Sequence, residues 1–151
     1  MILKYICGDE KVAIATSKWI LFDTEKKKIA KLTDDILDLY KSEYTGVFEE
    51  KELPKLKEVE ESSAQLEYEV RRLDIDVNKH MHNLNYLLLA YEALPEDVYF
   101  AEEMKNVRIM YKNQILLGEK INCYYTKQEG KHIITMKNKE NLSLHAIIEL
   151  N

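Results

Sequence analysis

Cysteine is scarce in this sequence, which excludes a disulfide-stapled fold. The chain has 2 cysteines. Cys7 and Cys123 lie far apart and form neither a CxxC pair nor a multi-cysteine framework. We therefore expect both thiols to be reduced and structural, which is typical of a cytoplasmic protein.

Glycine, proline and long hydrophobic runs are also sparse. With 4 glycines and 2 prolines among 151 residues, the chain is neither collagen-like nor of low complexity. No run approaches the ~20 apolar residues of a membrane helix. The opening segment, residues 1–7, lacks the basic leader and cleavage site of a signal peptide. The sequence therefore predicts a soluble, unexported protein with no membrane partner.

No excess of basic charge is present either. The net charge of −5 is spread over both halves of the chain, so the broad basic surface of a nucleic-acid-binding protein is not expected. A length of 151 residues suits one domain, or one domain with a fragment of another. Such a chain buries roughly two thirds of its surface on folding, which is enough for a ligand-holding core without staples or metals.

The N-terminal third combines a strand pattern with a short helix. Apolar residues alternate from Val12 and then crowd at residues 19–22, which predicts one long strand that ends near Asp23. Thr33 precedes acidic residues and a short apolar repeat through Tyr40, which predicts a capped helix. Residues 44–63 are acidic and lack periodicity, so we expect a linker there.

From residue 64 the pattern describes a complete folding unit. A strand over 65–70 and a polar segment over 74–83 precede an apolar helix that stops at Pro95. Because this helix is apolar nearly all round, we expect it to be buried on most sides. Four strands follow, over 99–111, 116–127, 131–137 and 142–150. This order predicts an α+β fold, with an antiparallel sheet wrapped around one helix.

The densest polar cluster lies where the first strand of this unit leads into the helix. The first N–H groups of a helix have no partner within it and favour negative charge, so this junction can stabilise an oxyanion. Asp76, Asn78 and His80 are spaced two apart and would point the same way in an extended segment. A carboxylate, an amide and an imidazole together can orient and deprotonate water.

A purely structural interpretation of the same cluster also stands. In it, Asn83 or His82 caps the helix, while Asp74 and Asp76 form ion pairs with Arg71 and Arg72. A metal site built from Asp76, His80 and His82 is not expected. His132 and His145 fall in predicted strands without acidic neighbours in the sequence, so we expect structural roles for both.

The junction resembles a known family. The run RLDIDVNKHMHNLNY at 72–86, followed by EALP at 92–95, is similar to the second-domain motif of the acyl-acyl-carrier-protein thioesterases. The runs AIATSKWILFD at 13–23 and LTDDI at 32–36 resemble the end of the family's first domain. VRIMYKNQ at 107–114, with Gly118 and Glu119, resembles the strand and turn that follow the motif.

The resemblance implies a fold and a domain arrangement. The family has two tandem hotdog domains, each a long helix wrapped by a curved antiparallel sheet. It implies that residues 64–151 form the complete second hotdog and residues 1–43 the C-terminal remnant of the first, with 44–63 as the acidic linker. Exposed strand edges and an incomplete first domain lead us to expect a homodimer.

The resemblance also implies an activity, which is hydrolysis of fatty acyl-acyl carrier protein to free fatty acid, without cofactor or metal. The implied catalytic residues are Asp76, Asn78, His80 and Gln114. The thioester carbonyl would lie near Asn83 and Leu84, and Tyr86 and Leu87 would help to bind the substrate.

The sequence departs from the family at two positions. Gln114 stands where many members have a glutamate, and Ile115 where some have a cysteine. Glutamine cannot take a proton from water, so that role would pass to Asp76 or, as the weaker candidate, Glu119. Cys123 lies too far along its strand to replace the cysteine. We therefore expect attack by water rather than covalent catalysis.

The sequence does not decide between two docking patches or between two substrates. An acidic carrier protein calls for a basic docking patch. The candidates are Lys105, Arg108, Lys112 and Lys120, or Lys26, Lys27, Lys28 and Lys31. Acyl-coenzyme A is an alternative substrate, because the fold does not choose between the two. A non-catalytic acyl-binding or dimerisation module is the alternative from a different class.

Overall fold

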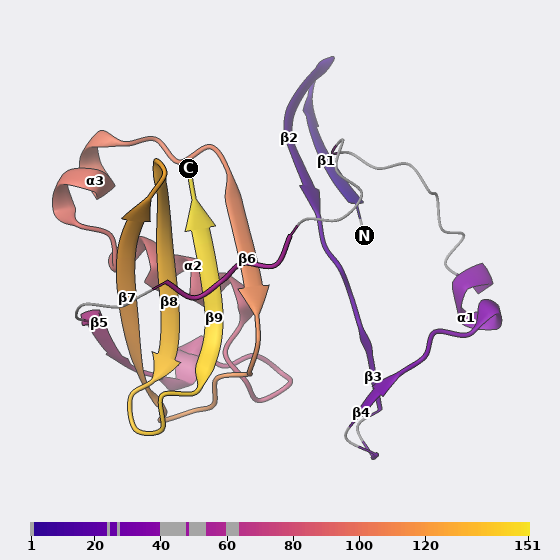
Figure 1. Ribbon diagram of the computed structural model, residues 1–151. Helices are drawn as coiled ribbons and strands as arrows, with labels where there is room; N and C mark the ends of the chain where they lie inside the picture. Colours follow the sequence, from indigo (N-terminus) through magenta and orange to yellow (C-terminus); the bar gives the residue numbers. More distant parts are fainter. Residues whose placement is uncertain (1, 24, 27, 40–47, 49–53, 60–63) are drawn as a thin grey trace. The chain divides into compact units, whose positions relative to one another are not determined.

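The computed structural model describes residues 2–23, 25–26, 28–39, 48, 54–59 and 64–151 (Figure 1). The chain divides into two compact units, Met1–Pro54 and Lys55–Asn151. The division falls inside the segment 44–63 that the sequence predicts as a linker. Each unit is described by itself.

The first unit consists of two hairpins and a short helix. Strand β1 (Ile2–Cys7) pairs antiparallel with β2 (Glu10–Thr16), and β3 (Leu21–Asp23) pairs with β4 (Lys28–Ala30). The predicted single long strand is therefore wrong, because β2 and β3 belong to different sheets. Helix α1 (Asp34–Leu39) confirms the predicted helix, although Tyr40 lies outside the described residues.

The first unit has little hydrophobic core of its own. None of its described residues is buried. Its large apolar side chains, among them Trp19, Ile20 and Ile29, are mostly exposed. Exposed apolar surface on this scale is typical of a part that packs against something else.

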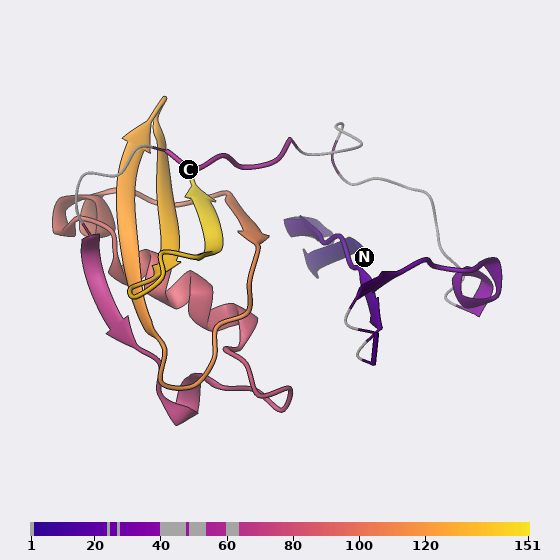
Figure 2. The same ribbon diagram turned by 60° about the horizontal axis from the view of Figure 1, so that its bottom comes forward.

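The second unit is an antiparallel sheet with one helix packed on its face. Its elements are β5 (Ala64–Glu69), a 3-10 turn (Arg72–Asp74), α2 (Asn83–Glu92), α3 (Glu96–Ala101), β6 (Val107–Tyr111), β7 (Lys120–Gln128), β8 (Lys131–Asn138) and β9 (Leu144–Leu150). The strand order is β5-β7-β8-β9-β6, with every neighbouring pair antiparallel. Figure 2 shows α2 lying across the curved sheet. The predicted α+β architecture is confirmed.

The core lies between α2 and the sheet. On the helix, Tyr86, Leu89 and Ala90 are buried. On the strands, alternate residues face the helix and are almost fully buried: Ile121, Cys123, Ile134, Met136, Ala146, Ile148 and Leu150. Burying each large aliphatic side chain contributes about 1.5–3 kcal/mol, so this layer is the main source of the unit's stability.

The predicted burial of α2 on most sides is wrong. Leu84 and Leu88 are 54% and 57% exposed, and they lie on the face of the helix that points away from the sheet. A single sheet covers only one face of a helix. The described residues therefore leave an apolar stripe on α2 open to solvent.

Two predicted strands begin later than expected. Residues 96–101 form α3 and not the start of a strand, because Pro95 precedes them and Glu96 and Asp97 occupy the first turn, where negative charge favours a helix. Residues 116–119 form a turn whose third residue, Gly118, has a φ of 79°. Left-handed backbone of this kind favours glycine, so β7 starts only at Lys120.

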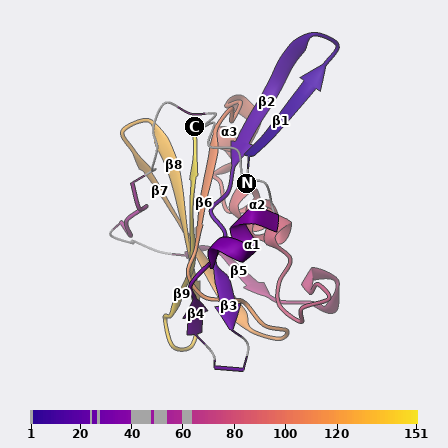
Figure 3. The same cartoon turned by 90° about the vertical axis from the view of Figure 1, so that its right-hand side faces the viewer.

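Residues 55–59 cross the sheet face opposite α2 (Figures 1 and 3). Glu58 holds this segment to β8 through an ion pair with Lys137, with 2.9 Å between Oε2 and Nζ. In the part of the chain that the structure describes, no helix is long and apolar enough to cross a membrane.

Candidate active site

The loop before α2 brings the predicted polar residues together, but not by the predicted geometry. Residues 76–80 are not extended. The Asp76 N–H donates to the His80 carbonyl (2.9 Å), and the Lys79 N–H donates to the Asp76 carbonyl (3.0 Å). Lys79 has a φ of 66°. Asp76, Asn78 and His80 therefore meet because the chain reverses tightly, and not because alternate side chains share a face.

Asp76 is the centre of this turn. Its carboxylate accepts hydrogen bonds from the Asn78 N–H (2.8 Å) and side-chain amide (3.3 Å). The His80 Nδ1 lies 3.8 Å from Asp76 Oδ1. Partial burial raises the pKa of Asp76, but the bonds from Asn78 and the neighbouring His80 outweigh it, so the pKa lies below its usual value. Asp76 is thus an ionised carboxylate beside an imidazole.

Asp74 holds the base of the loop. Its buried carboxylate accepts from the Tyr68 hydroxyl (2.7 Å) and the Arg71 N–H (2.7 Å), with the Arg71 guanidinium 3.4 Å away. Burial raises the pKa of Asp74, but these donors outweigh it and hold the pKa below its usual value. The structural interpretation is therefore correct for Asp74 and Arg71. It fails for Asp76, whose recorded partners are Asn78 and His80.

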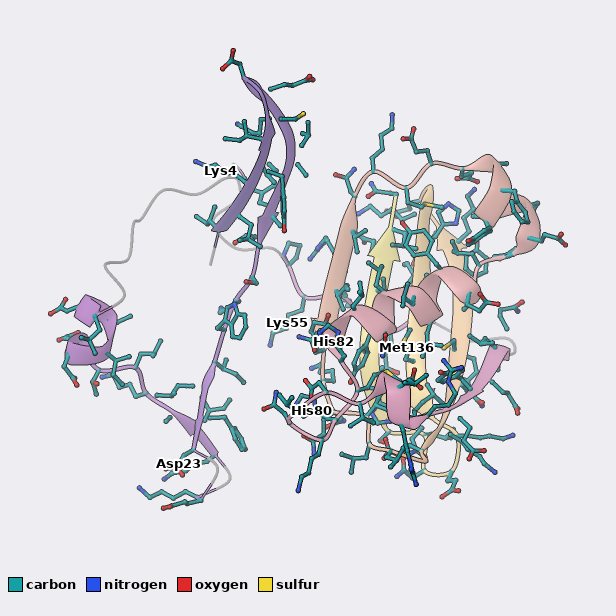
Figure 4. The ribbon with its side chains drawn as sticks, turned by 180° about the vertical axis from the view of Figure 1, so that it is seen from behind. Lys4, Asp23, Lys55, His80, His82 and Met136 are labelled. Carbon is teal, nitrogen blue, oxygen red and sulfur yellow. The ribbon has the colours of Figure 1, made fainter. Side chains whose placement is uncertain are left out.

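The start of α2 lies next to the loop (Figure 4). His82 caps the helix, since its Nδ1 accepts from the Leu84 N–H (3.2 Å), and its carbonyl accepts from the Asn85 N–H (2.8 Å). The predicted capping by His82 is confirmed. Among the described residues, the Asn83 N–H donates to no protein acceptor, whereas the Leu84 N–H donates to His82.

Gln114 lies beside the same loop through its neighbour in the sequence. The Ile115 carbonyl accepts from the Met81 N–H (2.8 Å), and the Ile115 N–H donates to the Tyr86 hydroxyl (3.2 Å). Gln114 itself is exposed. The hydroxyl of Tyr86, a predicted substrate-binding residue, is thus engaged with the backbone, and burial raises its pKa to about 12.

Residues 57–149 match the sequence family described as the acyl-ACP thioesterase C-terminal domain. The chain belongs to the acyl-ACP thioesterase family. Its C-terminal unit carries the matched domain, and the predicted relationship is confirmed.

Curated relatives in the acyl-ACP thioesterase family come from plants. The oleoyl-acyl carrier protein thioesterase of Coriandrum sativum is 29% identical over 75% of this chain and 33% of the relative. Oleoyl-acyl carrier protein thioesterase 2 of Arabidopsis thaliana is 25% identical over 89% of this chain and 39% of the relative. The chain thus spans little more than a third of the length of these relatives.

Solved structures agree on the fold. An acyl-ACP thioesterase from Bacteroides thetaiotaomicron aligns with a TM-score of 0.69 at 17% identity, over 85% of this chain and 51% of that one. A 12:0-ACP thioesterase from Umbellularia californica aligns with a TM-score of 0.73 at 15% identity, over 86% of this chain and 52% of that one. The predicted hotdog fold is confirmed.

The acyl-ACP thioesterase fold gives each of the two buried histidines, His132 and His145, an acidic neighbour that is distant in the sequence. The His132 Nε2 lies 2.9 Å from Glu102, and its Nδ1 lies 2.9 Å from the Tyr125 hydroxyl. The His145 Nε2 lies 3.8 Å from Glu119. These carboxylates are distant along the chain and approach the histidines only after the sheet folds, so the sequence did not show them.

Burial and hydrogen bonding also bear on the remaining candidate groups, Cys123 and Glu119. Burial raises the pKa of the Cys123 thiol to about 12, which keeps it protonated and supports the choice against a cysteine nucleophile. The described residues contain no group of three or more metal-binding side chains. Glu119 is engaged with the Leu116 N–H (2.9 Å) and faces His145.

Some basic residues of the candidate docking patches form ion pairs with acidic side chains. Arg108 pairs with Glu149 (3.6 Å) and Lys105 with Glu103 (3.7 Å). Lys112 and Lys120 are exposed. In the first unit, Lys26 pairs with Asp23 (3.6 Å), and Lys27 lies outside the described residues.

Asn85 contacts the candidate catalytic loop but was not among the residues predicted from the sequence. The side-chain amide of Asn85 donates to the Asp74 carbonyl (3.0 Å), eleven residues earlier. The available signal was an asparagine in the first turn of a helix, where its side chain can reach neighbouring backbone groups.

Proposed function

We propose that this chain carries the hydrolytic site of a thioesterase that converts fatty acyl-acyl carrier protein to free fatty acid. The observation that carries the proposal is the tight turn that sets a carboxylate, an amide and an imidazole beside the start of α2. Membership of the family and the names of the plant relatives support the substrate class.

In the proposed reaction, water attacks the carbonyl carbon of the thioester. The carbonyl oxygen gains negative charge, and the open N–H of Asn83 at the positive end of α2 stabilises it. When the intermediate collapses, the carbon–sulfur bond breaks and the carrier's sulfur leaves as a thiol after it receives the proton that the base took from water. The products are a fatty acid and the free carrier thiol.

His80 is the better candidate for the base that takes the proton from water. The lowered pKa of Asp76 makes its carboxylate a weak base, whereas an imidazole is an effective base near neutral pH. Asp76, whose Oδ1 lies 3.8 Å from the ring, would stabilise the imidazolium that forms. Asn78 serves this step by fixing Asp76, and Gln114 can hydrogen-bond water but cannot deprotonate it.

The apolar stripe on α2 supports the binding of an acyl chain. Leu84 and Leu88 are exposed on the side of the helix away from the sheet, and Leu87 is half-buried beside them. Each methylene of a fatty acyl group that such a surface buries contributes about 0.8 kcal/mol. The carrier itself would dock through exposed lysines, for which Lys112 and Lys120 are candidates in the C-terminal unit.

The test is thiol release from acyl-carrier and acyl-coenzyme A substrates. His80→Ala should lower kcat by about 100-fold, the size expected for a positioned proton-transfer group. Asp76→Ala should also lower kcat, because the imidazolium of His80 loses the carboxylate that stabilises it. Asp97→Ala, an exposed acid on α3, is the matched control and should keep full activity. Wild-type protein that hydrolyses no thioester, or full activity in both site variants, would exclude the proposed reaction.

The same assay separates the alternatives. Faster hydrolysis of acyl-coenzyme A than of the carrier substrate would favour the coenzyme thioesterase. The glutamine at position 114 favours the non-catalytic acyl-binding module, because many family members have at this position a glutamate, which could take a proton, and a glutamine cannot. Acyl binding without hydrolysis would identify that module.

We also propose a homodimer through the edge strand β6. Pairing two copies antiparallel about Ile109 sets Val107 against Tyr111 and Arg108 against Met110, so apolar residues meet and no like charges face each other. The other edge, β5, carries Glu67 and Glu69 and suits this pairing less well. Val107→Lys should weaken the dimer in light scattering after size exclusion, while Gln65→Lys on β5 should not. A wild-type monomer across micromolar concentrations would exclude this dimer.

The domain boundaries and compartment remain part of the proposal. Residues 64–151 are proposed to be a complete second hotdog domain and residues 1–43 the end of a first, joined by the acidic segment 44–63. The exposure of the first unit's apolar residues supports this. The free thiols of Cys7 and Cys123 support a cytoplasmic location.

A further inference from the structure

Two bonds to one backbone oxygen join the candidate catalytic loop to α2. The Asp74 carbonyl accepts from the His82 N–H (2.8 Å) and from the side-chain amide of Asn85 (3.0 Å). His82 is the last residue before the helix, and Asn85 lies in its first turn. The backbone oxygen of Asp74 therefore connects the start of the loop to the start of the helix through two hydrogen bonds.

The loop is anchored at its base and not at its tip. The turn bonds between Asp76, Lys79 and His80 and the bridge between Ile75 and Met81 hold its two arms together. They join loop residues to one another, so they fix the shape of the loop but not its position. The position of the loop is set by the bond from the Met81 N–H to the Ile115 carbonyl and, relative to the first N–H groups of α2, by the bonds at Asp74.

The other bonds to Asp74 come from a different direction. Tyr68 and Arg71 hold its carboxylate and tie it to β5 and the residues just after that strand. The His82 N–H belongs to the backbone and survives any side-chain change. Asn85 therefore provides the side-chain hydrogen bond from the helix to the base of the loop.

We infer that Asn85 is a positioning residue, whose amide sets the distance between the loop that carries Asp76 and His80 and the open N–H of Asn83. The inference rests on the proposed function for its effect on rate. A displacement of about 1 Å between reacting groups can cost about 100-fold in rate. Because the His82 bond remains, we expect loss of the Asn85 donor to lower kcat by roughly 10-fold and leave KM nearly unchanged.

Three substitutions isolate the donor. Asn85→Asp keeps the shape but sets a carboxylate against the Asp74 carbonyl, and Asn85→Ala removes the side chain. Asn85→Gln keeps an amide on a longer side chain and should restore part of the rate. Asn141→Asp makes the same chemical change in the turn before β9, far from the loop along the chain, and is the matched control. If Asn85→Asp does not fold, Asn85→Ala decides the question.

A second measurement needs no activity. Hydrogen exchange of the Asp76 and His82 amides should rise by about 10-fold in Asn85→Asp and Asn85→Ala, because local opening at the loop base becomes easier. Amides in the β8–β9 pair should exchange as in the wild type. This pattern, together with a lower kcat at constant KM, supports the inference.

Several results would overturn the inference. They are an unchanged loop exchange, a kcat equal to wild type in both variants, or an effect on KM alone. If the wild type hydrolyses no thioester, the proposed function fails while the exchange experiment still decides whether Asn85 fixes the loop. The two failures are thus distinguishable.

Discussion

Replacing Tyr86 with phenylalanine removes one buried hydrogen bond and little else. Tyr86 is 3% exposed, and its hydroxyl accepts from the N–H of Ile115, a fully buried residue. The ring packs edge-on against Tyr111 with centroids 5.1 Å apart, a contact that phenylalanine keeps. The variant therefore leaves the Ile115 N–H buried without a partner.

The expected loss of stability follows from the unpaired Ile115 N–H. An unsatisfied buried N–H costs about 1–3 kcal/mol. For a domain of this size each kcal/mol lowers Tm by about 4–8 °C, so a loss near 2 kcal/mol corresponds to roughly 8–16 °C. Tyr111→Phe is the control. The Tyr111 hydroxyl donates to the Asn83 carbonyl at 3.3 Å, but the residue is 44% exposed and water can replace the bond. It should cost under about 1 kcal/mol.

The assay is urea and thermal unfolding followed by far-ultraviolet circular dichroism. Fluorescence of the single tryptophan is unsuitable, because Trp19 lies in the other unit. A Tyr86→Phe variant as stable as wild type, or a Tyr111→Phe variant that loses as much as Tyr86→Phe, would refute the reasoning. A rise in KM at unchanged stability would instead return Tyr86 to its predicted role in substrate binding.

Two further substitutions and one labelling experiment test the site and the core. Asp74→Asn should lower stability at neutral pH. Because the folded pKa of Asp74 is depressed, its contribution is present above about pH 4 and is lost as pH falls through the folded pKa, so the variant should show a shallower acid transition in denaturant titrations. Gln114→Glu should raise kcat by about 10-fold if a carboxylate there can take a proton, and an unchanged rate would leave His80 as the sufficient base. A thiol reagent should label the exposed Cys7 in the native protein and Cys123 only after denaturation, and rapid native labelling of Cys123 would contradict its burial.

The sequence by itself determined the class of the fold and pointed to the loop that forms the candidate site. Apolar residues recur at every second residue in strands and at every third or fourth in helices, so residues 64–151 could be recognised as one strand, a helix and four further strands. The run from Arg72 to Tyr86 located the polar loop, since helix starts attract capping residues and leave N–H groups open. Both signals are local, which is why a single chain carries them.

The tertiary structure decided everything that depends on partners distant along the chain. The backbone of Ile115 forms hydrogen bonds with Met81 and Tyr86, which are distant in the sequence. His132 and His145 each lie beside a glutamate. Leu84 and Leu88 are exposed on the side of α2 away from the sheet. The tertiary structure also replaced the extended arrangement of residues 76–80 with a tight turn and revealed the bond from Asn85 to Asp74. Hydrogen bonds and burial are set by which surfaces meet, and residue spacing along one strand or helix does not contain that information.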